Sequence, residues 1–340
     1  MRAYRFDAFN GLEDLRMREE DDPRPQRGEL LIRIHAVSLN FRDIAMLRGR
    51  YPRAYRKGLI PVSDAAGEVI EIGDGVEAFK VGDRVMGAFH PRWFGGDMPS
   101  TIAGDSYGSD KDGWLVELKV VNQEAVVLLP DALPYEEAST LPCAGLTAWT
   151  ALTGSVPIRA GHTVLVQGTG GVSIFALQLA RAVGASVIAT TSGAAKAERL
   201  KALGASEVVN YVDDPEWGKR VRALTGGRGV DRVVEVGGPG TIAQSLRAVA
   251  VGGEIASIGF LSTENPGIDF FQLKLSGARF RNITVGDRAG LLELTRAVAD
   301  TGLKPVIDRV FEFEDAQAAF AHLESGTHLG KVVIRCCAAA

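Results

Sequence analysis

A glycine-rich run in the middle of the chain has the residue types and spacing of a phosphate-binding turn. It consists of Gly168-Thr169-Gly170-Gly171-Val172-Ser173, between an apolar segment and an amphipathic one. The first glycine permits a tight turn, and the second, Gly170, lets the backbone approach a pyrophosphate without a Cβ in the way. The following helix would offer unpaired N–H groups to the anion, and Ser173 stands where a third glycine is usual. A purely structural turn is the alternative, but five further expected strands favour a dinucleotide site.

The residues after the next expected strand, 186–190, indicate which dinucleotide is bound. An NAD site normally carries Asp or Glu about 20 residues after the glycines, to hold the ribose 2′-hydroxyl. Thr191 stands there instead, followed by Ser192 and Lys196, where a hydroxyl and an ammonium can bind a 2′-phosphate. A carboxylate would repel that phosphate, so its absence favours NADP(H) over NAD. The alternative for Lys196 is a solvated residue of the helix.

Three later strand ends also carry glycines. They are Val236-Gly237-Gly238, Ile258-Gly259-Phe260 and Val285-Gly286. In a doubly wound sheet such ends line the crevice where ligands bind, so we expect their backbone groups to face the ribose and the nicotinamide. Ordinary turn chemistry is the alternative for each of them.

These turns require alternating strands and helices, and the chain from Pro134 onward has that pattern. Short apolar strands and a helical segment follow one another at 163–167, 174–181, 186–190, 207–210, 232–236, 254–258 and 279–285. The alternation predicts an α/β fold with a doubly wound parallel sheet and helices on both faces. The first third has the pattern of short strands and turns, and the C-terminal strand 331–334 is expected to return to it.

Composition and charge argue against several other classes of function. The 340 residues exceed what one hydrophobic core usually supports, and the net charge of -4 favours neither nucleic acid nor an acidic membrane as a partner. No stretch approaches the roughly 18 apolar residues of a membrane span, and the first residues lack the apolar core of a signal peptide. The three cysteines suggest no disulfide framework. We expect a cytoplasmic protein that acts on a small molecule.

Taken in order, these and other motifs resemble the medium-chain dehydrogenase/reductase superfamily over essentially the whole chain. The matching pieces are Gly28-Glu29-Leu30-Leu31-Ile32-Arg33, Gly67-Glu68-Val69, Phe79-Lys80-Val81-Gly82-Asp83-Arg84-Val85, Leu141-Pro142-Cys143-Ala144-Gly145-Leu146-Thr147-Ala148 and Gly330-Lys331-Val332-Val333. The resemblance implies a GroES-like catalytic domain and a Rossmann domain, with the active site in the cleft between them. We place the GroES-like domain at 1–130 and 290–340, and the Rossmann domain at 131–289.

The resemblance also implies where a catalytic zinc would bind. The zinc-dependent branch holds the metal by Cys, His and Cys, with a Glu beside the His. In this chain Asn40 stands at the first Cys position, Ser63 and Asp64 stand at the His and Glu positions, and only Cys143 is kept. Catalytic zinc normally needs three protein ligands, and the cysteine-rich structural zinc lobe of that branch is missing too. We therefore expect no metal.

Other positions resemble the zinc-independent quinone oxidoreductases of the superfamily. There an Asn and a Tyr lie beside the nicotinamide, which makes Asn40 and Tyr51, with Asp43 in the same element, our candidate catalytic residues. The Asn40 amide and the Tyr51 phenol would stabilise charge on the acceptor oxygen, and Tyr51 can also relay a proton. Hydrogen bonding within loops is the structural alternative for both. Further matches are Ser192, Lys196 and Tyr211 at the 2′-phosphate, Thr147 near the nicotinamide, and Lys331 as a basic group near the cofactor.

Two features depart from that branch and leave the substrate open. One is Arg42, and the other is the long aromatic loop 90–112, which contains Trp93 and Phe94. Together with Tyr51 the loop suggests an apolar pocket, and a surface loop folded on itself is the alternative.

The leading hypothesis is an NADP(H)-dependent reductase of an enone, quinone or activated carbonyl, because an enone needs only modest polarisation. A zinc-free alcohol or aldehyde dehydrogenase is the second hypothesis. A noncatalytic dinucleotide-binding protein or redox sensor is the third. By analogy of fold we also expect a homodimer or homotetramer, paired through an edge strand near 254–258.

Overall fold

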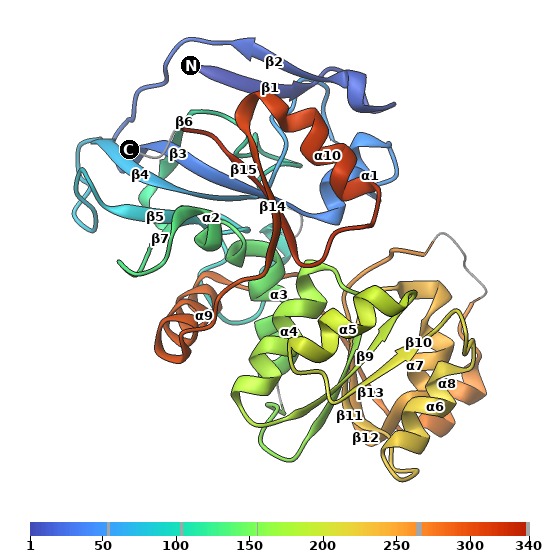
Figure 1. Ribbon diagram of the computed structural model, residues 1–340. Helices are drawn as coiled ribbons and strands as arrows, with labels where there is room; N and C mark the ends of the chain where they lie inside the picture. The colour runs from blue at the N-terminus through green and yellow to red at the C-terminus, as the bar shows by residue number, and fades with distance from the viewer. Residues whose placement is uncertain (53–54, 103–104, 155, 263–266, 338–340) are drawn as a thin grey trace. The chain divides into compact units, whose positions relative to one another are not determined.

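The computed structural model describes residues 1–337 apart from 53–54, 103–104, 155 and 263–266. The chain divides into two compact units (Figure 1). The first unit consists of Met1–Leu146 with Gly286–Ala340, and the second consists of Thr147–Val285. The domain limits expected from the sequence lie at 130/131 and 289/290. They stay a prediction, because the division into compact units does not test them.

The first unit is built on a mixed sheet around the long apolar strand β3 (Glu29–Leu39). Its strand order is β14-β15-β3-β4-β5-β7, and β6 also pairs with β3. Neighbours are antiparallel, except that β14 and β15 run parallel. The remaining strands of this unit are β1 (Arg2–Phe6), β2 (Leu15–Glu19), β4 (Asp64–Ile72), β5 (Arg84–Gly87), β6 (Leu118–Asn122), β7 (Val126–Leu128), β14 (Ile307–Glu312) and β15 (Lys331–Arg335).

Short helices cover this sheet and connect its strands. They are α1 (Phe41–Leu47), α2 (Tyr135–Ala138), the π-helical turn η4 (Leu141–Gly145), α9 (Arg288–Thr301), α10 (Ala316–Glu324) and the 3₁₀ turns Leu12–Asp14, Ser100–Ile102, Gln123–Ala125 and Phe313–Asp315. The core draws large side chains from distant segments, because Phe6, Trp114 and Phe320 are all fully buried in one cluster. Burying each such ring stabilises the fold by roughly 2–3 kcal/mol. The N-terminus, the middle and the C-terminus of the unit are therefore held together by apolar packing.

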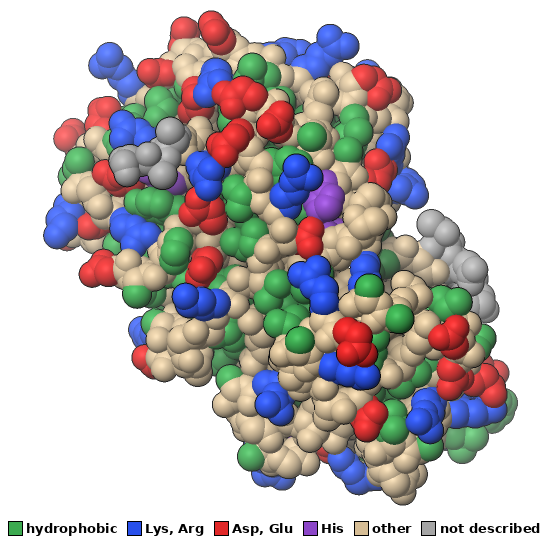
Figure 2. Space-filling model, in the orientation of Figure 1, with side chains coloured by type: hydrophobic (Ala, Val, Ile, Leu, Met, Phe, Trp, Pro, Cys, Tyr) green, Lys and Arg blue, Asp and Glu red, His purple; other side chains and the backbone are tan. Residues whose placement is uncertain are grey.

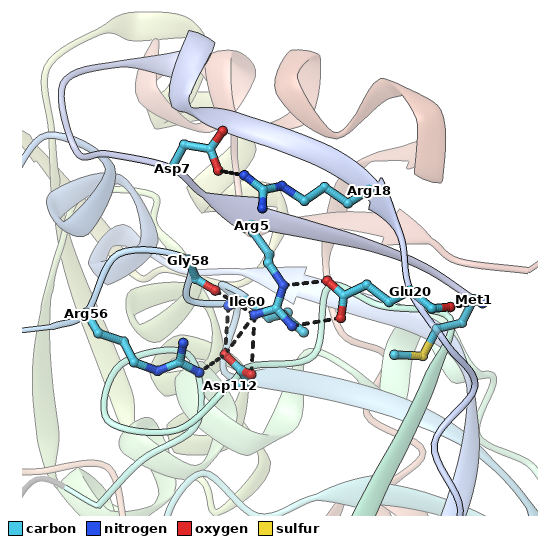
Figure 3. Close-up of polar contacts among 9 residues, drawn as sticks. All are labelled: Met1, Arg5, Asp7, Arg18, Glu20, Arg56, Gly58, Ile60 and Asp112. Carbon is cyan, nitrogen blue, oxygen red and sulfur yellow. Dashed lines mark hydrogen bonds and ion pairs between the residues drawn. The ribbon is translucent and has the colours of Figure 1, made fainter.

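An ionic cluster fastens the N-terminal strand pair β1–β2 to the rest of the first unit (Figure 3). Arg5 donates from Nε and Nη2 to Glu20, at 2.5 and 2.8 Å, and from Nη1 to the carbonyl of Gly58, at 2.5 Å. Asp112 lies 3.4 Å from the same Nη1 and accepts the backbone N–H of Ile60, at 3.0 Å. The hydrogen bond from Arg5 lowers the pKa of the Glu20 carboxyl. The end of the long loop 90–112 is thereby joined to the first strand.

The second unit contains a six-stranded parallel sheet in the order β10-β9-β8-β11-β12-β13. Every neighbouring pair is parallel. The chain runs outward from β8 to β10, then returns to the centre and runs outward again from β11 to β13. This topology confirms the predicted doubly wound sheet, with its switch point between β8 and β11. Its elements are α3 (Leu146–Thr153), β8 (Thr163–Gln167), α4 (Gly171–Ala182), β9 (Ser186–Thr191), α5 (Ala194–Ala202), β10 (Glu207–Asn210), α6 (Trp217–Leu224), β11 (Val230–Glu235), η5 (Gly238–Gly240), α7 (Ile242–Ala248), β12 (Val249–Ser257), α8 (Phe270–Ser276) and β13 (Arg279–Asn282).

The prediction that residues near 254–258 form an edge strand is wrong. Residues 254–257 belong to β12, which pairs with β11 on one side and with β13 on the other. One more parallel strand follows α8, so β13 forms the edge of the sheet. Apolar periodicity predicts that a segment is a strand, but it does not give the order of strands in the sheet.

Figure 2 shows Lys and Arg side chains interspersed with Asp and Glu on the face that it presents. Within the described ranges, no helix has both the length and the apolar character that crossing a bilayer would require.

Candidate functional site

The turn after β8 has the geometry that the glycine run predicts. Gly168 has a φ of +71°, which favours glycine, and its N–H donates to the carbonyl of Thr190 at 2.8 Å. Gly170 begins α4 as its N-cap with an ordinary φ of −71°. A Cβ added at Gly170 would meet no atom within 4 Å. Neither backbone conformation nor packing therefore requires glycine at Gly170, and the close approach of a phosphate to the backbone stays a prediction.

Ser173 fits in the place of the third glycine because its hydroxyl is used. It is buried in the first turn of α4, and its Oγ donates to the carbonyl of Gln167, the last residue of β8, at 2.7 Å. The serine thus ties the helix to the strand that precedes the turn. Gly171 and Val172 form the first turn of the same helix.

The predicted 2′-phosphate residues gather at the end of β9. Thr191 ends that strand, and its carbonyl accepts the N–H of Tyr211 at 3.0 Å. Ser192 is exposed, and Lys196 lies in the first turn of α5. The Oγ1 of Thr191 is buried and has no hydrogen-bond partner among the described residues.

The glycines after β11 and β12 differ from those at the first turn. A Cβ at Gly237 would lie 2.3 Å from Thr241 Oγ1, and one at Gly259 would lie 2.1 Å from the carbonyl of Val236. The protein's own packing requires glycine at both places, as the turn alternative expects. The contacts of Val236, Gly237, Gly259 and Phe260 with a cofactor therefore stay a prediction. Val285 also stays one; it adopts a φ of +56°, which is a strained conformation for a β-branched residue.

A buried carboxylate that sequence reasoning missed braces the switch point of the sheet. Glu235 ends β11 and accepts the N–H groups of Gly237 and Gly238 at 2.9 and 3.0 Å. It also accepts Gln167 Nε2, at 2.8 Å, and the hydroxyl of Ser245. The side chain of Gln167 thereby joins the end of β8 to the turn after β11. The only signal in the sequence was a polar residue at the end of each apolar strand.

In the first unit, the residues at the expected zinc-ligand positions form a closed hydrogen-bond network. Asn40 Nδ2 donates to Asp64 Oδ2 at 3.0 Å, and Ser63 Oγ donates to Asp64 Oδ1 at 2.7 Å. The backbone N–H of Cys143 reaches the same carboxylate at 3.2 Å. Lys331 Nζ donates to Asn40 Oδ1, at 2.5 Å, and to the backbone carbonyl of the residue that precedes Asn40, at 2.6 Å. We call these five residues the Asp64 network.

Burial dominates the electrostatics of the Asp64 network. It raises the pKa of the Asp64 carboxyl and lowers the pKa of the Lys331 ammonium, and each charge partly offsets the effect on the other. Burial also raises the pKa of the Cys143 thiol, which keeps that group protonated. An ammonium beside an amide, a hydroxyl and a neutral thiol does not fit a catalytic zinc. The described part of the chain contains no cluster of three His, Cys, Asp or Glu side chains that can hold a metal.

The structure gives the candidate catalytic residues definite partners. The Asn40 amide is engaged within the Asp64 network on both its oxygen and its nitrogen. Asp43 is fully buried, caps α1 by accepting the N–H of Asn40 at 2.7 Å, and has its pKa raised by burial to about 6. The Tyr51 ring is half-buried, and the Arg42 guanidinium lies 5.5 Å from its centroid. Thr147, the first residue of the second unit, is buried in α3.

Arg42 is a buried cation whose role the sequence did not indicate. Its Nη1 donates to the carbonyl of Tyr107 at 2.8 Å, and its guanidinium stacks over the ring of Phe89 at 4.7 Å. It therefore ties α1 to the residue that precedes the long loop and to the second half of that loop.

The described part of the loop 90–112 folds on itself. Asp105 pairs with Arg92 at 2.5 Å and with Lys111 at 3.3 Å, and its carbonyl contacts His90 Nδ1 at 2.9 Å. Phe94 is half exposed. These contacts favour the surface-loop alternative; residues 103–104 lie outside the described residues.

Comparisons with known proteins agree with both units. Residues 26–131 match the family described as alcohol dehydrogenase GroES-like domain, and residues 171–300 match the family described as zinc-binding dehydrogenase. A zinc-type alcohol dehydrogenase-like protein of Schizosaccharomyces pombe is 36% identical over 97% of each chain.

Two solved structures are similar over nearly the whole chain. One is an NAD-dependent alcohol dehydrogenase, 33% identical with a TM-score of 0.90, covering 99% of this chain and 100% of that one. The other is Escherichia coli quinone oxidoreductase complexed with NADPH, 25% identical with a TM-score of 0.84, again covering 99% of this chain and 100% of that one.

Proposed function

Because the chain belongs to the medium-chain dehydrogenase/reductase superfamily, we propose that it is a zinc-independent, NADP(H)-dependent oxidoreductase that transfers a hydride to an enone, quinone or activated carbonyl. The observation that carries the proposal is the Asp64 network, in which Lys331 lies against Asn40 where zinc-dependent relatives would hold a metal. The buried ammonium and its hydrogen-bonded amide form a preorganised site without a metal ion, in which the Asp64 carboxylate balances the charge of Lys331.

When bound, the dinucleotide supplies the hydride. The open backbone at Gly168 and Gly170 with the start of α4 would bind its pyrophosphate. On the side of the acceptor, the network would stabilise negative charge that develops on oxygen, with Lys331 positioning Asn40. Tyr51 is the candidate for delivering a proton.

The preference for NADP(H) rests on the residues after β9. Thr191-Ser192-Gly193-Ala194-Ala195-Lys196 contains no carboxylate, and Thr191 Oγ1 is buried without a partner in the described part of the chain. The similar quinone oxidoreductase is described as complexed with NADPH, which supports the proposal. The similar NAD-dependent alcohol dehydrogenase favours the second candidate function, oxidation of an alcohol or reduction of an aldehyde.

A screen of NADPH oxidation separates the two candidates. Purified protein is given quinones, enones and simple aldehydes, with and without a metal chelator. We expect turnover of enones or quinones that the chelator does not change. Activity confined to aldehydes would replace the leading substrate class by the second, and loss of activity with the chelator would refute zinc independence.

Exchanging Lys196 for alanine tests the cofactor. We expect the Kd for NADPH to rise about tenfold, because a hydrogen-bonded ion pair with phosphate contributes on the order of 1.5 kcal/mol, and the Kd for NADH to stay unchanged. Fluorescence titration measures both constants. Lys201→Ala on the same helix is the matched control, because Lys201 is exposed and pairs with Glu198. Tighter binding of NADH than of NADPH, unaffected by Lys196→Ala, would reverse the assignment.

We also propose that the chain forms a homodimer or homotetramer. Phe280 is exposed on the edge strand β13, and Phe271 and Leu275 are exposed on α8, which precedes that strand in the chain. A second copy can bury these apolar side chains. Light scattering of the purified protein measures the assembly, and a monomer would refute it.

A further inference from the structure

A cavity of about 460 Å³ lies in the second unit at the edge of the sheet opposite to the glycine turn. Its walls come from the segments that lead into β8, β11, β12 and β13, and thus from the N-terminal ends of these strands. The glycine turn follows the C-terminal end of β8, so the five residues of that strand separate the two places. The charged lining side chains are Arg159, Arg222, Arg228, Arg232, Arg279 and Asp231.

These arginines carry far more charge than the lining balances. Arg228 pairs with Asp231 through two hydrogen bonds, at 2.6 and 2.8 Å. Arg222 donates to backbone carbonyls instead, among them those of Arg247 at 2.8 Å and Val249 at 2.6 Å. Carbonyls satisfy its N–H groups, but they bring no opposing formal charge. The wall is therefore strongly positive.

Two of the lining residues carry polar atoms that lack a hydrogen-bond partner among the described residues, and these atoms are donors. Arg232 is 1% exposed; its Nη2 donates to the carbonyl of Val156 at 2.7 Å, and its Nη1 lies 3.3 Å from Glu254. Its Nε has no hydrogen-bond partner among the described residues. His162 Nε2 lies 3.0 Å from the donor Arg159 Nε, so its proton belongs on Nδ1, which is buried and equally without a described partner. Both donors are buried, so an anion in the cavity would act on them through its charge rather than by direct contact.

We propose that this cavity binds a compact polyanion of the oligophosphate or tricarboxylate kind, separately from the dinucleotide. Guanidinium groups bind phosphate and carboxylate through paired, charge-assisted hydrogen bonds. The volume lies in the range of small-molecule sites, and it holds several anionic groups rather than one. A polyanion would also offset the burial that lowers the pKa of Arg232 to about 10.

Calorimetric titration with sodium tripolyphosphate and with citrate tests the proposal, and acetate serves as the monoanion. We expect one site per chain for at least one polyanion and no binding of acetate. The titration is repeated with Gly170→Val, which removes binding at the glycine turn; we expect the same Kd. Whichever of the two probes binds more tightly identifies the class of anion.

The double variant Arg159→Ala/Arg279→Ala should raise the Kd at least about tenfold, as expected when roughly 1.4 kcal/mol of binding free energy is lost. Both side chains are exposed, so the fold should persist, and circular dichroism checks it. Arg220→Ala is the matched control, an exposed arginine of α6 outside the lining. Absence of binding, binding unchanged in the double variant, equal binding of acetate, or loss of binding in Gly170→Val would each overturn the proposal. None of these outcomes depends on oxidoreductase activity.

Discussion

Replacing Asp64 with alanine is expected to lower the free energy of unfolding by about 4 kcal/mol, because removing one partner leaves the other buried charge uncompensated. Asp64 accepts hydrogen bonds from Asn40, Ser63 and the N–H of Cys143, and its own side chain is fully buried. The variant also leaves the Lys331 ammonium without its main counter-charge. Urea denaturation at pH 7 measures the loss.

Two further variants separate charge from shape. Asp64→Asn keeps the size of the side chain and an acceptor oxygen, so it should lose less stability than Asp64→Ala. Lys331→Met removes the ammonium, and in combination with Asp64→Asn it should cost less than the sum of the two single changes, because the pair is coupled. Asp131→Ala, at an exposed aspartate, is the control and should change stability by no more than about 0.5 kcal/mol. Additive single and double effects would show that Lys331 and Asp64 do not act as a pair.

The same variants report on function. We expect Lys331→Met to reduce turnover of the preferred acceptor about a hundredfold, because the Asn40 amide that Lys331 positions would no longer be preorganised for the developing charge. Because Lys331 acts through Asn40, the pH–rate profile of the Lys331→Met variant should lack one limb of the wild-type profile. Turnover at the wild-type rate with an unchanged pH profile would remove Lys331 from the mechanism.

The second large effect concerns the two kinds of glycine in the second unit. Gly170→Ala should raise the Kd for NADPH about a hundredfold, which corresponds to about 2.7 kcal/mol, while it changes the stability of the free protein by no more than about 1 kcal/mol. A methyl group at Gly170 meets no protein atom within 4 Å, so it intrudes only on a ligand. Fluorescence titration and urea denaturation measure the two quantities.

Gly259→Ala is the opposite case. Its Cβ would lie 2.1 Å from the carbonyl of Val236, so the turn must shift, and we expect a loss of about 3 kcal/mol of stability. If Gly170→Ala leaves the affinity for NADPH unchanged, the glycine turn is not the pyrophosphate site. If Gly259→Ala is neutral, the glycines after β11 and β12 are not held by packing.

The sequence by itself determined the fold class and the place of the glycine turn. Both depend on residues that are neighbours in the chain: the apolar segment 163–167, the turn at Gly168 and the amphipathic segment after it. Local periodicity and turn chemistry decide such features. The family resemblance implies in addition that Asn40 and Ser63, which are poor metal ligands, stand at the zinc-ligand positions.

Tertiary structure alone decided what replaces those ligands. Lys331 lies 291 positions from Asn40 in the sequence, and Gln167 lies 68 positions from Glu235, so no local pattern announces either contact. The strand order that makes β13 the edge, and the burial that shifts the pKa of Asp64, likewise arise only when distant segments pack. The same holds for the arginine-lined cavity, because its lining residues belong to strand ends that lie far apart in the sequence.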